Sequence, residues 1–600
     1  MSLDSILAEA TINGREERLW EITNGDAPGD AYSATLQRIS NLGGTKSQVG
    51  MATLMWISHS QRPLHTNELR DALAVEIGSP DLNAENILLI QTILGCCLGL
   101  VTVDEEASTV RLIHLTLKEH LSAQPKLFQE AHSTIAETCL TYLSFNSVKS
   151  LPLALNTAPP TVPFLQYTSS CWATHARQGT TECAKSLALD LLDQYPNHIS
   201  AKLLLLNDNH WPWELTSDKC PQGFTGLHCL AYLGMTDLLS PLIKIKSWDV
   251  NGRDFTGSTP LIWAARRGHR DTVELLLELN DIDANRPDDR GRTPLLWAAR
   301  KRHEGVVKLL LDRKEIDPNS TEYDGESPLW LAAYMGYEEV VELLIGRQGI
   351  NPNLAGRNGQ TPLCQAAYRG HDGVVKMLLG REDINPNLAD NDGETPLWWA
   401  VFKGRHELVK VLLSRHDVNP NSEGSDGETP LWRAVIDGRQ EIAKSLLTRQ
   451  DTDPNKARDD GQTPLCKAAE IGHEGILKLL LDRQDIDVNA GGNSGRTPLW
   501  HAVTGGHEGI ARVLLERSDI NPNPTNSDGQ TPLLWAAGKG RAGMVEVLLG
   551  RGDVNRNAAD SKGRTPLSLA AEGGYTAVVN FLLGNVEPNL PDGPNQPTEE

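Results

Sequence analysis

A helix is predicted to begin inside the stretch Asp460-Gly461-Gln462-Thr463-Pro464-Leu465. Its Asp-Gly pair favours a tight turn, its threonine can cap the next helix, and its proline stands where a helix tolerates proline best. The tripeptide (Thr or Ser)-Pro-Leu occurs ten times at an unbroken spacing of 34 residues, beginning at Thr259, Thr293, Ser327, Thr361, Thr395, Thr429, Thr463, Thr497, Thr531 and Thr565. A period of this length predicts a solenoid of stacked helical repeats.

Each repeat is predicted to contain two helices, so the fold class is mainly α. Residues 466–470 continue the first helix through the small pair Ala468 and Ala469, which lets a neighbouring repeat approach closely. The pair Gly472-His473 ends this helix, and residues 474–482 form a second helix with one apolar face.

The repeated unit resembles the ankyrin repeat, whose motif reads D-G-x-T-P-L-H-x-A-A-x-x-G-H. The resemblance runs from Phe224 to Asn589 and covers ten clear copies. An eleventh, degenerate copy begins at Thr225 and is expected to cap the N-terminal end of the stack. We place the ankyrin repeats at residues 222–589 and a disordered tail at residues 590–600.

The repeats depart from the family motif at the histidine that follows Pro-Leu. This histidine survives only as His228, and Trp, Cys, Ser or aliphatic residues take its place elsewhere. We therefore expect apolar packing to replace most of the hydrogen bonds that the histidine makes in the family. Tryptophans fill the position four times, at Trp330, Trp398, Trp432 and Trp500.

The chain before the repeats carries a different pattern. Residues 47–58 and 66–75 predict two helices joined by a turn at Arg62-Pro63-Leu64, and residues 98–103 and 109–113 predict a β-hairpin. Helices followed by such a hairpin suggest a winged helix. The predicted divisions are an N-terminal helical segment at 1–45, a winged-helix-like domain at 46–122 and a helical linker region at 123–215.

The segment with Leu54-Met55-Trp56-Ile57-Ser58 and His114-Leu115-Thr116 resembles the winged-helix region of fungal NACHT-ankyrin (NLR-like) proteins. In those multidomain NTPases this region lies between a nucleotide-binding domain and the repeats. The nearest phosphate-loop candidate, Gly43-Gly44-Thr45-Lys46-Ser47, lacks the spacing G-x-x-x-x-G-K-[ST]. We therefore expect no bound nucleotide, and the chain reads as a relative or remnant without the nucleotide-binding motor.

Composition narrows the classes of partner. The chain has 56 Lys and Arg against 78 Asp and Glu, a net charge of −22, and neither its N-terminal part nor its repeats are basic. This balance argues against nucleic acid as a partner. The apolar stretch at 87–103 is too short and too interrupted to span a bilayer, so no membrane contact is expected.

Compartment and chemistry follow from cysteine and histidine usage. The nine cysteines are odd in number and lack Cys-x-x-Cys spacing, and no signal peptide begins at Met1, which predicts reduced thiols in the cytoplasm. Four His-Glu pairs lack the second histidine of a zinc helix, so neither a metal nor another cofactor is expected. We predict a protein that is not an enzyme.

The resemblance implies that residues after each Ala-Ala pair line a concave groove. The first half of this groove is basic and aromatic, and we expect it to bind an acidic or extended peptide segment of a protein partner. Ordinary variation of a solvated surface, and packing between repeats for the tryptophans, are the alternatives. The candidate partner-binding residues are Trp263, Arg266, Arg267, Trp297, Arg300, Lys301, Tyr334, Tyr368, Arg369, Trp399, Phe402 and Lys403.

Arginines also recur at the 34-residue period, often with an acid two residues on. We interpret them as cations that complement helix C-termini. They stand at Arg313, Arg347, Arg381, Arg415, Arg449, Arg483, Arg517 and Arg551. The predicted function is non-catalytic protein binding through the ankyrin groove, for which the resemblance implies signalling or immune-like recognition. The alternative is a remnant or fragment of a NACHT-type signalling NTPase.

Overall fold

The computed structural model describes residues 28–124, 126–207, 221–245, 248–493 and 495–584. The chain divides into two compact units, Met1–Ile316 (unit 1) and Asp317–Glu600 (unit 2). The boundary falls inside the repeat region, so each unit contains repeats. The predicted tail at 590–600 and most of the predicted N-terminal segment at 1–45 lie outside the described residues.

Unit 1 opens with a winged-helix arrangement. Its helices are α3 (Pro28–Ser40), α4 (Gly44–His59), α5 (Thr66–Ala74), α6 (Ile90–Cys96) and α7 (Leu115–Ser122), with a 3-10 turn η1 (Ala84–Asn86). The strands β2 (Val101–Asp104) and β3 (Thr109–Leu112) form the predicted antiparallel hairpin, in which Val101 pairs with Leu112. A two-residue strand, β1 (Leu64–His65), pairs with β3 and completes the order β1-β3-β2. The sequence pattern predicted only a turn there, because two residues carry no alternation.

A second helical group of unit 1 follows, in the segment predicted as a helical linker. It consists of α8 (Ala131–Leu143), α9 (Asn146–Lys149), α10 (Leu165–Ala176), α11 (Glu182–Asp193), η2 (Tyr195–Asn197) and α12 (Ile199–Leu206). Aromatic side chains fill its core: Phe164 stacks on Tyr167 at 5.6 Å between ring centroids, and both rings contact the edge of Trp56 from α4. The winged helix and this group therefore share one core.

The repeats of unit 1 start directly against α11. A Cβ at Gly226, the first residue of α13, would collide with the backbone carbonyl of Leu192. Glycine at this position lets α13 pack closely on α11. The degenerate copy thus lies between the helical group and the clear repeats, as expected of an N-terminal cap. The repeat helices of unit 1 are α13 (Gly226–Leu233), α14 (Thr236–Ile245), α15 (Pro260–Arg267), α16 (Arg270–Leu277), α17 (Pro294–Arg300) and α18 (Glu304–Leu311).

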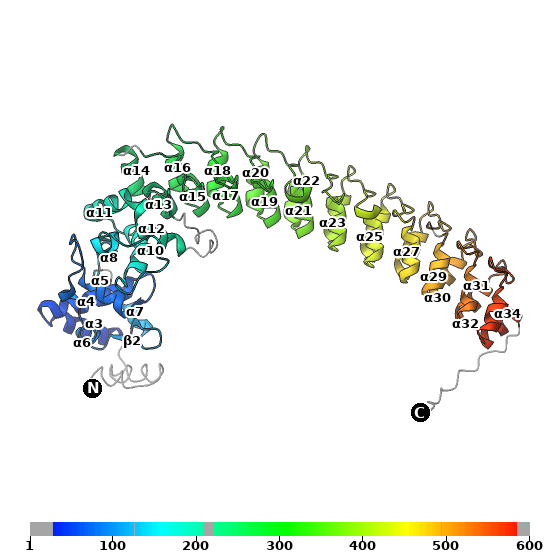
Figure 1. Ribbon diagram of the computed structural model, residues 1–600, viewed down its shortest axis with the longest axis horizontal. Coiled ribbons are helices and arrows are strands. Elements are labelled where there is room, and N and C mark those ends of the chain that lie inside the picture. Colours follow the sequence, from blue (N-terminus) through cyan, green and yellow to red (C-terminus); the bar gives the residue numbers. More distant parts are fainter. Residues whose placement is uncertain (1–27, 125, 208–220, 246–247, 494, 585–600) are drawn as a thin grey trace, which may run out of the picture. The chain divides into compact units, whose positions relative to one another are not determined.

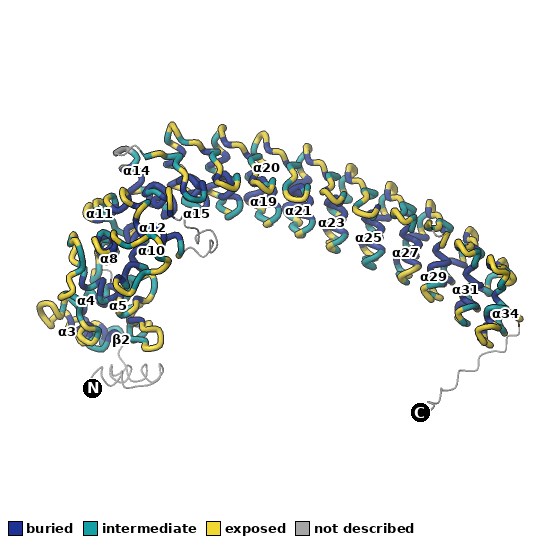
Figure 2. The backbone as a smooth tube through the Cα atoms, viewed as in Figure 1, coloured by how far each residue is buried: buried dark blue, intermediate teal, exposed yellow. Residues whose placement is uncertain are grey.

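Unit 2 contains eight repeats of the same two-helix form, with two additional 3-10 turns, η3 (Arg357–Gly359) and η4 (Ser425–Gly427). Successive first helices stand side by side (Figure 1), and Figure 2 shows them largely buried while the hairpin loops between repeats are largely exposed. The first helices are α19 (Pro328–Met335), α21 (Pro362–Arg369), α23 (Pro396–Phe402), α25 (Pro430–Ile436), α27 (Pro464–Ile471), α29 (Pro498–Gly505), α31 (Pro532–Gly538) and α33 (Pro566–Glu572). The second helices are α20 (Glu338–Ile345), α22 (Asp372–Leu379), α24 (His406–Leu413), α26 (Gln440–Thr448), α28 (Glu474–Leu481), α30 (Glu508–Leu515), α32 (Ala542–Leu549) and α34 (Thr576–Leu583).

The Thr-Pro-Leu signal acts as predicted. Thr463 stands just before α27, and its Oγ1 accepts a hydrogen bond from the Cys466 amide at 3.3 Å, with Pro464 at the first helical position. Gly472 ends the helix with φ 95°, a left-handed conformation that favours glycine. These start and stop signals of α27 therefore lie within one turn of the helix that they bound.

Two side-chain rungs tie each repeat of unit 2 to the next. The Asn421 carboxamide donates to the Asp451 carbonyl at 2.6 Å and accepts from the Asp453 amide at 2.8 Å. Arg449 donates to the Leu413 carbonyl at 3.3 Å and pairs with Asp451. The arginine row therefore complements helix C-termini as predicted, but the helix concerned belongs to the preceding repeat. Equivalent asparagines are Asn319, Asn353, Asn387, Asn455, Asn489 and Asn523.

The position of the family histidine is less apolar than expected. His228 bonds the Gly252 carbonyl at 3.1 Å, and the indole nitrogens of Trp330 and Trp432 donate to the carbonyls of Gln360 and Gln462 at 2.8 and 3.3 Å. The thiols of Cys364 and Cys466 also donate to loop carbonyls. The expectation of mainly apolar replacement was wrong for Trp330, Trp432 and these two cysteines, because indole and thiol groups retain a donor that reaches the loop backbone.

Candidate protein-binding surface

Trp263 and Trp297 of unit 1, on α15 and α17, lie inside the repeats. They are 2% and 4% exposed. Their indole nitrogens donate to Asp254 Oδ2 at 2.7 Å and to Asp288 Oδ2 at 3.1 Å, and both carboxylates come from the preceding hairpin loop. Each tryptophan thus fastens a loop to its helix, and its ring is not available as a large contact surface.

The cations of unit 1 lie on aromatic rings. The Arg266 guanidinium is 5% exposed and lies 4.5 Å from the Trp297 ring centroid, while the exposed Arg267 lies 4.4 Å from the Tyr232 ring. Such contacts are worth about 0.5–2 kcal/mol each, depending on desolvation. Arg300 and Lys301 are half-buried at the end of α17. The unit 1 candidates thus form a largely buried network with Arg267 at its edge.

Unit 2 presents more aromatic surface. Tyr334, Tyr368, Trp399 and Phe402, on α19, α21 and α23, are all partly exposed. Tyr334 stacks on Trp330 at 5.4 Å, and Phe402 stacks on Trp398 at 5.2 Å, so a buried tryptophan supports each of these two rings. Tyr368 meets Trp399 edge to face at 4.9 Å. We call Tyr334, Tyr368, Trp399 and Phe402 the aromatic row.

Cations cross from one repeat to the next over the aromatic row. The Arg369 guanidinium lies 4.1 Å from the Tyr334 ring centroid, Lys403 Nζ lies 4.3 Å from Tyr368, and the Arg433 guanidinium lies 4.8 Å from Phe402. Arg369 and Lys403 are nevertheless exposed. The structure brings these predicted residues together as one surface, whose rings are held in place before any partner binds.

Sequence reasoning missed a group of carboxylates beside the aromatic row. Asp390, Asp392 and Glu394, from the hairpin loop before α23, each offer an oxygen within 4.8 Å of the others. Asp390 accepts hydrogen bonds from the amides of Asp392 and Glu394, from Gln360 Nε2 and from Trp399 Nε1. The Asp-Gly-Glu sequence at 392–394 was interpreted only as a turn, although it repeats at 324–326 and 426–428.

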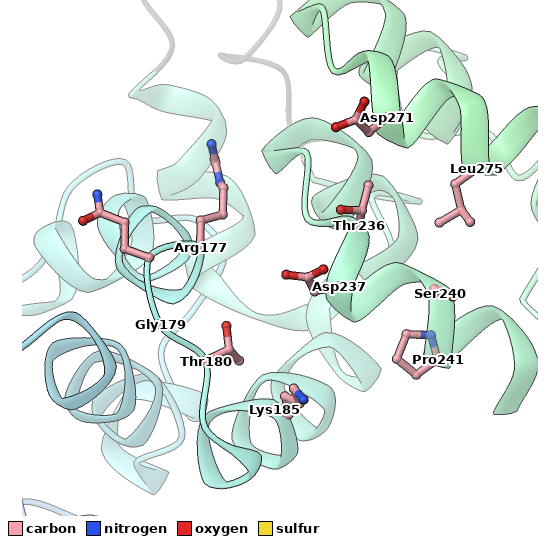
Figure 3. A pocket seen from close by; sticks show the side chains of 11 residues that line it. Arg177, Gly179, Thr180, Lys185, Thr236, Asp237, Ser240, Pro241, Asp271 and Leu275 are labelled. Carbon is pink, nitrogen blue, oxygen red and sulfur yellow. The ribbon is translucent and has the colours of Figure 1, made fainter. Parts of the chain in front are cut away.

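A pocket of about 710 Å³ lies in unit 1 between the α10–α11 connection and the helices α14 and α16. Arg177 and Lys185 line it from one side, and Asp237 and Asp271 from the other (Figure 3). Lys185 pairs with Glu182 at 2.7 Å. Its lining residues come from segments far apart in the chain, and no sequence signal pointed to it.

Family comparisons agree with this geometry. The family model for ankyrin repeats (three copies) matches seven overlapping stretches, at 173–288, 227–322, 279–356, 314–390, 363–457, 431–526 and 518–592. The chain belongs to the ankyrin repeat family. The match begins within α10, earlier than the Phe224 at which the motif itself becomes readable.

The winged helix also has a family match. The model of the GPI inositol-deacylase winged helix domain matches residues 38–136 of this ankyrin repeat protein. Among solved structures, the crystal structure of the ankyrin repeat domain of Bcl-3, a unique member of the IkappaB protein family, is 26% identical, with a TM-score of 0.35. It covers 38% of this chain and 100% of its own. No curated protein matches the chain.

Two further observations bear on the environment of this ankyrin repeat protein. Across the part of the chain that the structure describes, no helix combines the length and apolar character needed to cross a bilayer. The eight cysteines among the described residues are free thiols, and six of them lie within helices of the repeats or of the neighbouring helical group. Burial raises the pKa of Cys229 and Cys364 to about 12, which keeps these two thiols protonated at neutral pH.

Proposed function

We propose that this ankyrin repeat protein is a non-catalytic interaction protein that binds an extended segment of a protein partner along the first helices of unit 2. The aromatic row, with Arg369 and Lys403, forms the contact surface. The single observation that carries the proposal is that four partly exposed rings on three successive repeats are each braced by a second ring or a cation. Rigid aromatic side chains lose little entropy on binding and are common at energetic centres of interfaces.

Affinity capture from a native lysate, followed by mass spectrometry, identifies the partner. The triple variant Tyr334→Ala, Tyr368→Ala and Phe402→Ala is expected to lose that partner, because each ring contributes area that a truncation removes. Circular dichroism and thermal unfolding check that the repeats remain folded. A matched variant with three exposed residues of second helices replaced, Glu342→Ala, Lys376→Ala and Lys410→Ala, should retain the partner. Retention by the aromatic variant would overturn the proposal.

We further propose that the winged helix links partner binding to signalling in the cytoplasm. The resemblance to fungal NACHT-ankyrin proteins and the winged helix family match support this role. The alternative is a remnant or fragment of a NACHT-type signalling NTPase. Equilibrium binding of a fluorescent ATP analogue by the purified chain tests for NTPase function: no binding is expected, because the phosphate-loop spacing is missing, and saturable binding would favour the NTPase alternative.

A further inference from the structure

At two places in unit 2, adjacent hairpin loops pair through side chains 30 residues apart. Gln360 Nε2 donates to Asp390 Oδ2 at 3.1 Å across this offset, and Glu428 lies 3.9 Å from Arg458. In both pairs, the residue before a Thr-Pro-Leu signal faces a side chain in the next loop. In the second pair, the carboxylate of Glu428, which precedes the signal, lies opposite the cation of Arg458 in the next loop.

Glu394 stands at the first of these positions but faces a glycine, as Glu326 and Gln462 also do; unlike Glu326, Glu394 is buried. The residue 30 positions on is Gly424, which has no side chain. Glu394 is 8% exposed, and its carboxylate makes no hydrogen bond or ion pair with any residue that the structure describes. A buried carboxylate without a partner is costly unless a ligand or a proton neutralises it.

The charged groups around Glu394 are mostly negative as well. Asp390 and Asp392 belong to the same loop, Glu428 to the next loop and Arg433 to α25. Burial, together with the charges of Asp390, Asp392 and Glu428 and against a smaller opposing effect of Arg433, raises the pKa of Glu394 to about 7. Arg433 is already engaged, since it lies over Phe402 and pairs with Asp437 at 2.9 Å.

We propose that a lysine or arginine side chain of the partner segment binds beside Glu394 and Asp392, in the role that Arg458 has toward Glu428. This inference rests on the proposed function and specifies its partner: the bound segment is basic at this point. It replaces the expectation of an acidic segment at this point, because Arg369 and Lys403 already lie over aromatic rings, whereas the carboxylates of Asp392 and Glu394 make no hydrogen bond or ion pair with any described residue.

A single organic cation fits the site better than a metal ion. Both oxygens of Asp390 already accept two hydrogen bonds each, which leaves Asp392 and Glu394 to receive an incoming charge. Calcium takes six to eight oxygen ligands, more than these two carboxylates supply. An ammonium or guanidinium group needs only two or three acceptors and can rest against the neighbouring Trp399 ring.

Titration of the purified full chain with a peptide of four arginines, capped at both ends, tests the proposal at pH 8, where Glu394 is ionised. The variants Glu394→Gln and Gly424→Arg should each weaken binding by about tenfold or more, the fold-change of one charge-assisted hydrogen bond. Gly424→Arg places an arginine of the protein itself beside Glu394, where it should compete with the cation of the peptide. The backbone φ of −88° at this glycine suits any side chain; a Cβ there would lie 3.2 Å from Trp398 Nε1 and 3.3 Å from Glu394 Cγ, so the Trp398 ring must shift by a few tenths of an ångström, and thermal unfolding checks that this variant remains folded. Glu342→Gln, a change at an exposed acid of α20, is the matched control and should bind as the native chain does.

A second readout needs no ligand. Glu394→Gln should raise the thermal midpoint of unfolding, because it removes a buried charge that makes no hydrogen bond or ion pair with any described residue. A merely structural Glu394 predicts a lower midpoint, which would overturn the proposal. Tighter binding of the equivalent capped peptide of four glutamates, unchanged binding by both variants, or saturable binding of calcium chloride that competes with the arginine peptide would each do the same.

The two proposals fail in different ways. If the aromatic triple variant loses the partner while Glu394→Gln and Gly424→Arg retain it, the basic-segment inference is wrong and the proposed function stands. If the aromatic variant retains the partner, the proposed function is wrong, and the peptide titration still decides whether the carboxylates beside Trp399 accept a cation.

Discussion

Unit 1 and unit 2 share the repeat and its rungs, which in unit 1 include Asn251, Asn285 and Arg313, but unit 1 adds a second means of stabilisation. In unit 1, buried histidines join elements of the helical group: His175 bonds His132 of α8 at 2.8 Å and Tyr167 of its own helix at 2.9 Å, and His198 bonds the Leu143 carbonyl at 2.9 Å. In unit 2, asparagine and arginine rungs repeat at fixed offsets between neighbours. The first kind of stability depends on protonation and on the whole fold, and the second is a sum of local, nearly identical terms.

The largest expected difference is in acid stability: lowering the pH should destabilise unit 1 much more than unit 2. Burial lowers the pKa of His175, His198 and His269 to about 4, and all three belong to unit 1. Since the unfolded chain takes up these protons near pH 6.5, their contribution is complete above that pH and is lost as the pH falls toward 4. At pH 5 each should cost unit 1 about 2 kcal/mol, or about 6 kcal/mol together.

Hydrogen exchange measured by mass spectrometry at pH 7 and pH 5, corrected for intrinsic rates, measures the protection of backbone amides in both units of the intact chain. Protection should fall in α8, α10 and α12 much more than in α25 and α27. Equal losses in the two units would contradict the contrast. Replacing His198 by Gln should remove one share of the acid sensitivity, which tests whether the histidines cause it.

Cutting one rung of unit 2 should have a smaller and local effect. Asn421→Ala removes two hydrogen bonds to the next loop and should cost about 1–3 kcal/mol. Exchange should accelerate around residues 449–455 and remain unchanged in unit 1. The control Asn580→Ala, on the exposed face of α34, should be nearly neutral; a loss of protection that spreads through unit 2 would show that the rungs are not local.

Replacing a tryptophan by phenylalanine in each unit tests what the indole Nε1–H group contributes to stability there. Trp432 Nε1 donates to a loop carbonyl in unit 2, whereas Trp172 Nε1 in unit 1 is buried without a hydrogen-bond partner. Both changes remove similar volume, but only Trp432→Phe removes a hydrogen bond, since the Gln462 carbonyl then keeps only the Arg458 amide as its donor. Urea unfolding followed by far-UV circular dichroism should show Trp432→Phe as the more damaging change by about 1 kcal/mol. The reverse order would mean that packing, not the indole donor, decides both sites.

The smallest effect is expected from the exposed ion pairs of unit 2. The Arg449 side chain lowers the pKa of Asp451, so the pair stabilises above the ordinary carboxyl range and is lost as the pH falls through the lowered pKa. Asp451→Asn should cost less than about 1 kcal/mol, and 1 M salt should reduce that difference further, because the aspartate is half exposed. A salt-independent cost above this range, measured by thermal unfolding, would point to a structural role of the carboxylate.

The sequence predicted what depends on neighbours in the chain. Thr463, Pro464 and Gly472 act within one turn of the helix they start or end, so the repeat boundaries and the period followed directly. Arg449 could be assigned to a helix terminus, but its acceptor, the Leu413 carbonyl, lies 36 residues back in the preceding repeat.

The candidate surface was harder to predict because burial depends on partners from other repeats. Trp263 and Trp399 occupy equivalent positions in the sequence, yet the first is buried against Asp254 and the second is partly exposed. The unpartnered carboxylate of Glu394 could not be predicted either, because Glu326 also has a glycine 30 residues on and burial distinguishes the two.

The rungs of Asn421 and Arg449 also bear on how such a chain can change its length. Each rung reaches the adjoining repeat through backbone groups at a fixed offset, so excising or duplicating 34 residues between equivalent points restores the same contacts at the junction. A single inserted residue breaks them. Recombination can therefore add or remove whole repeats without designing a new interface, and selection acts on which side chains each copy carries into the groove.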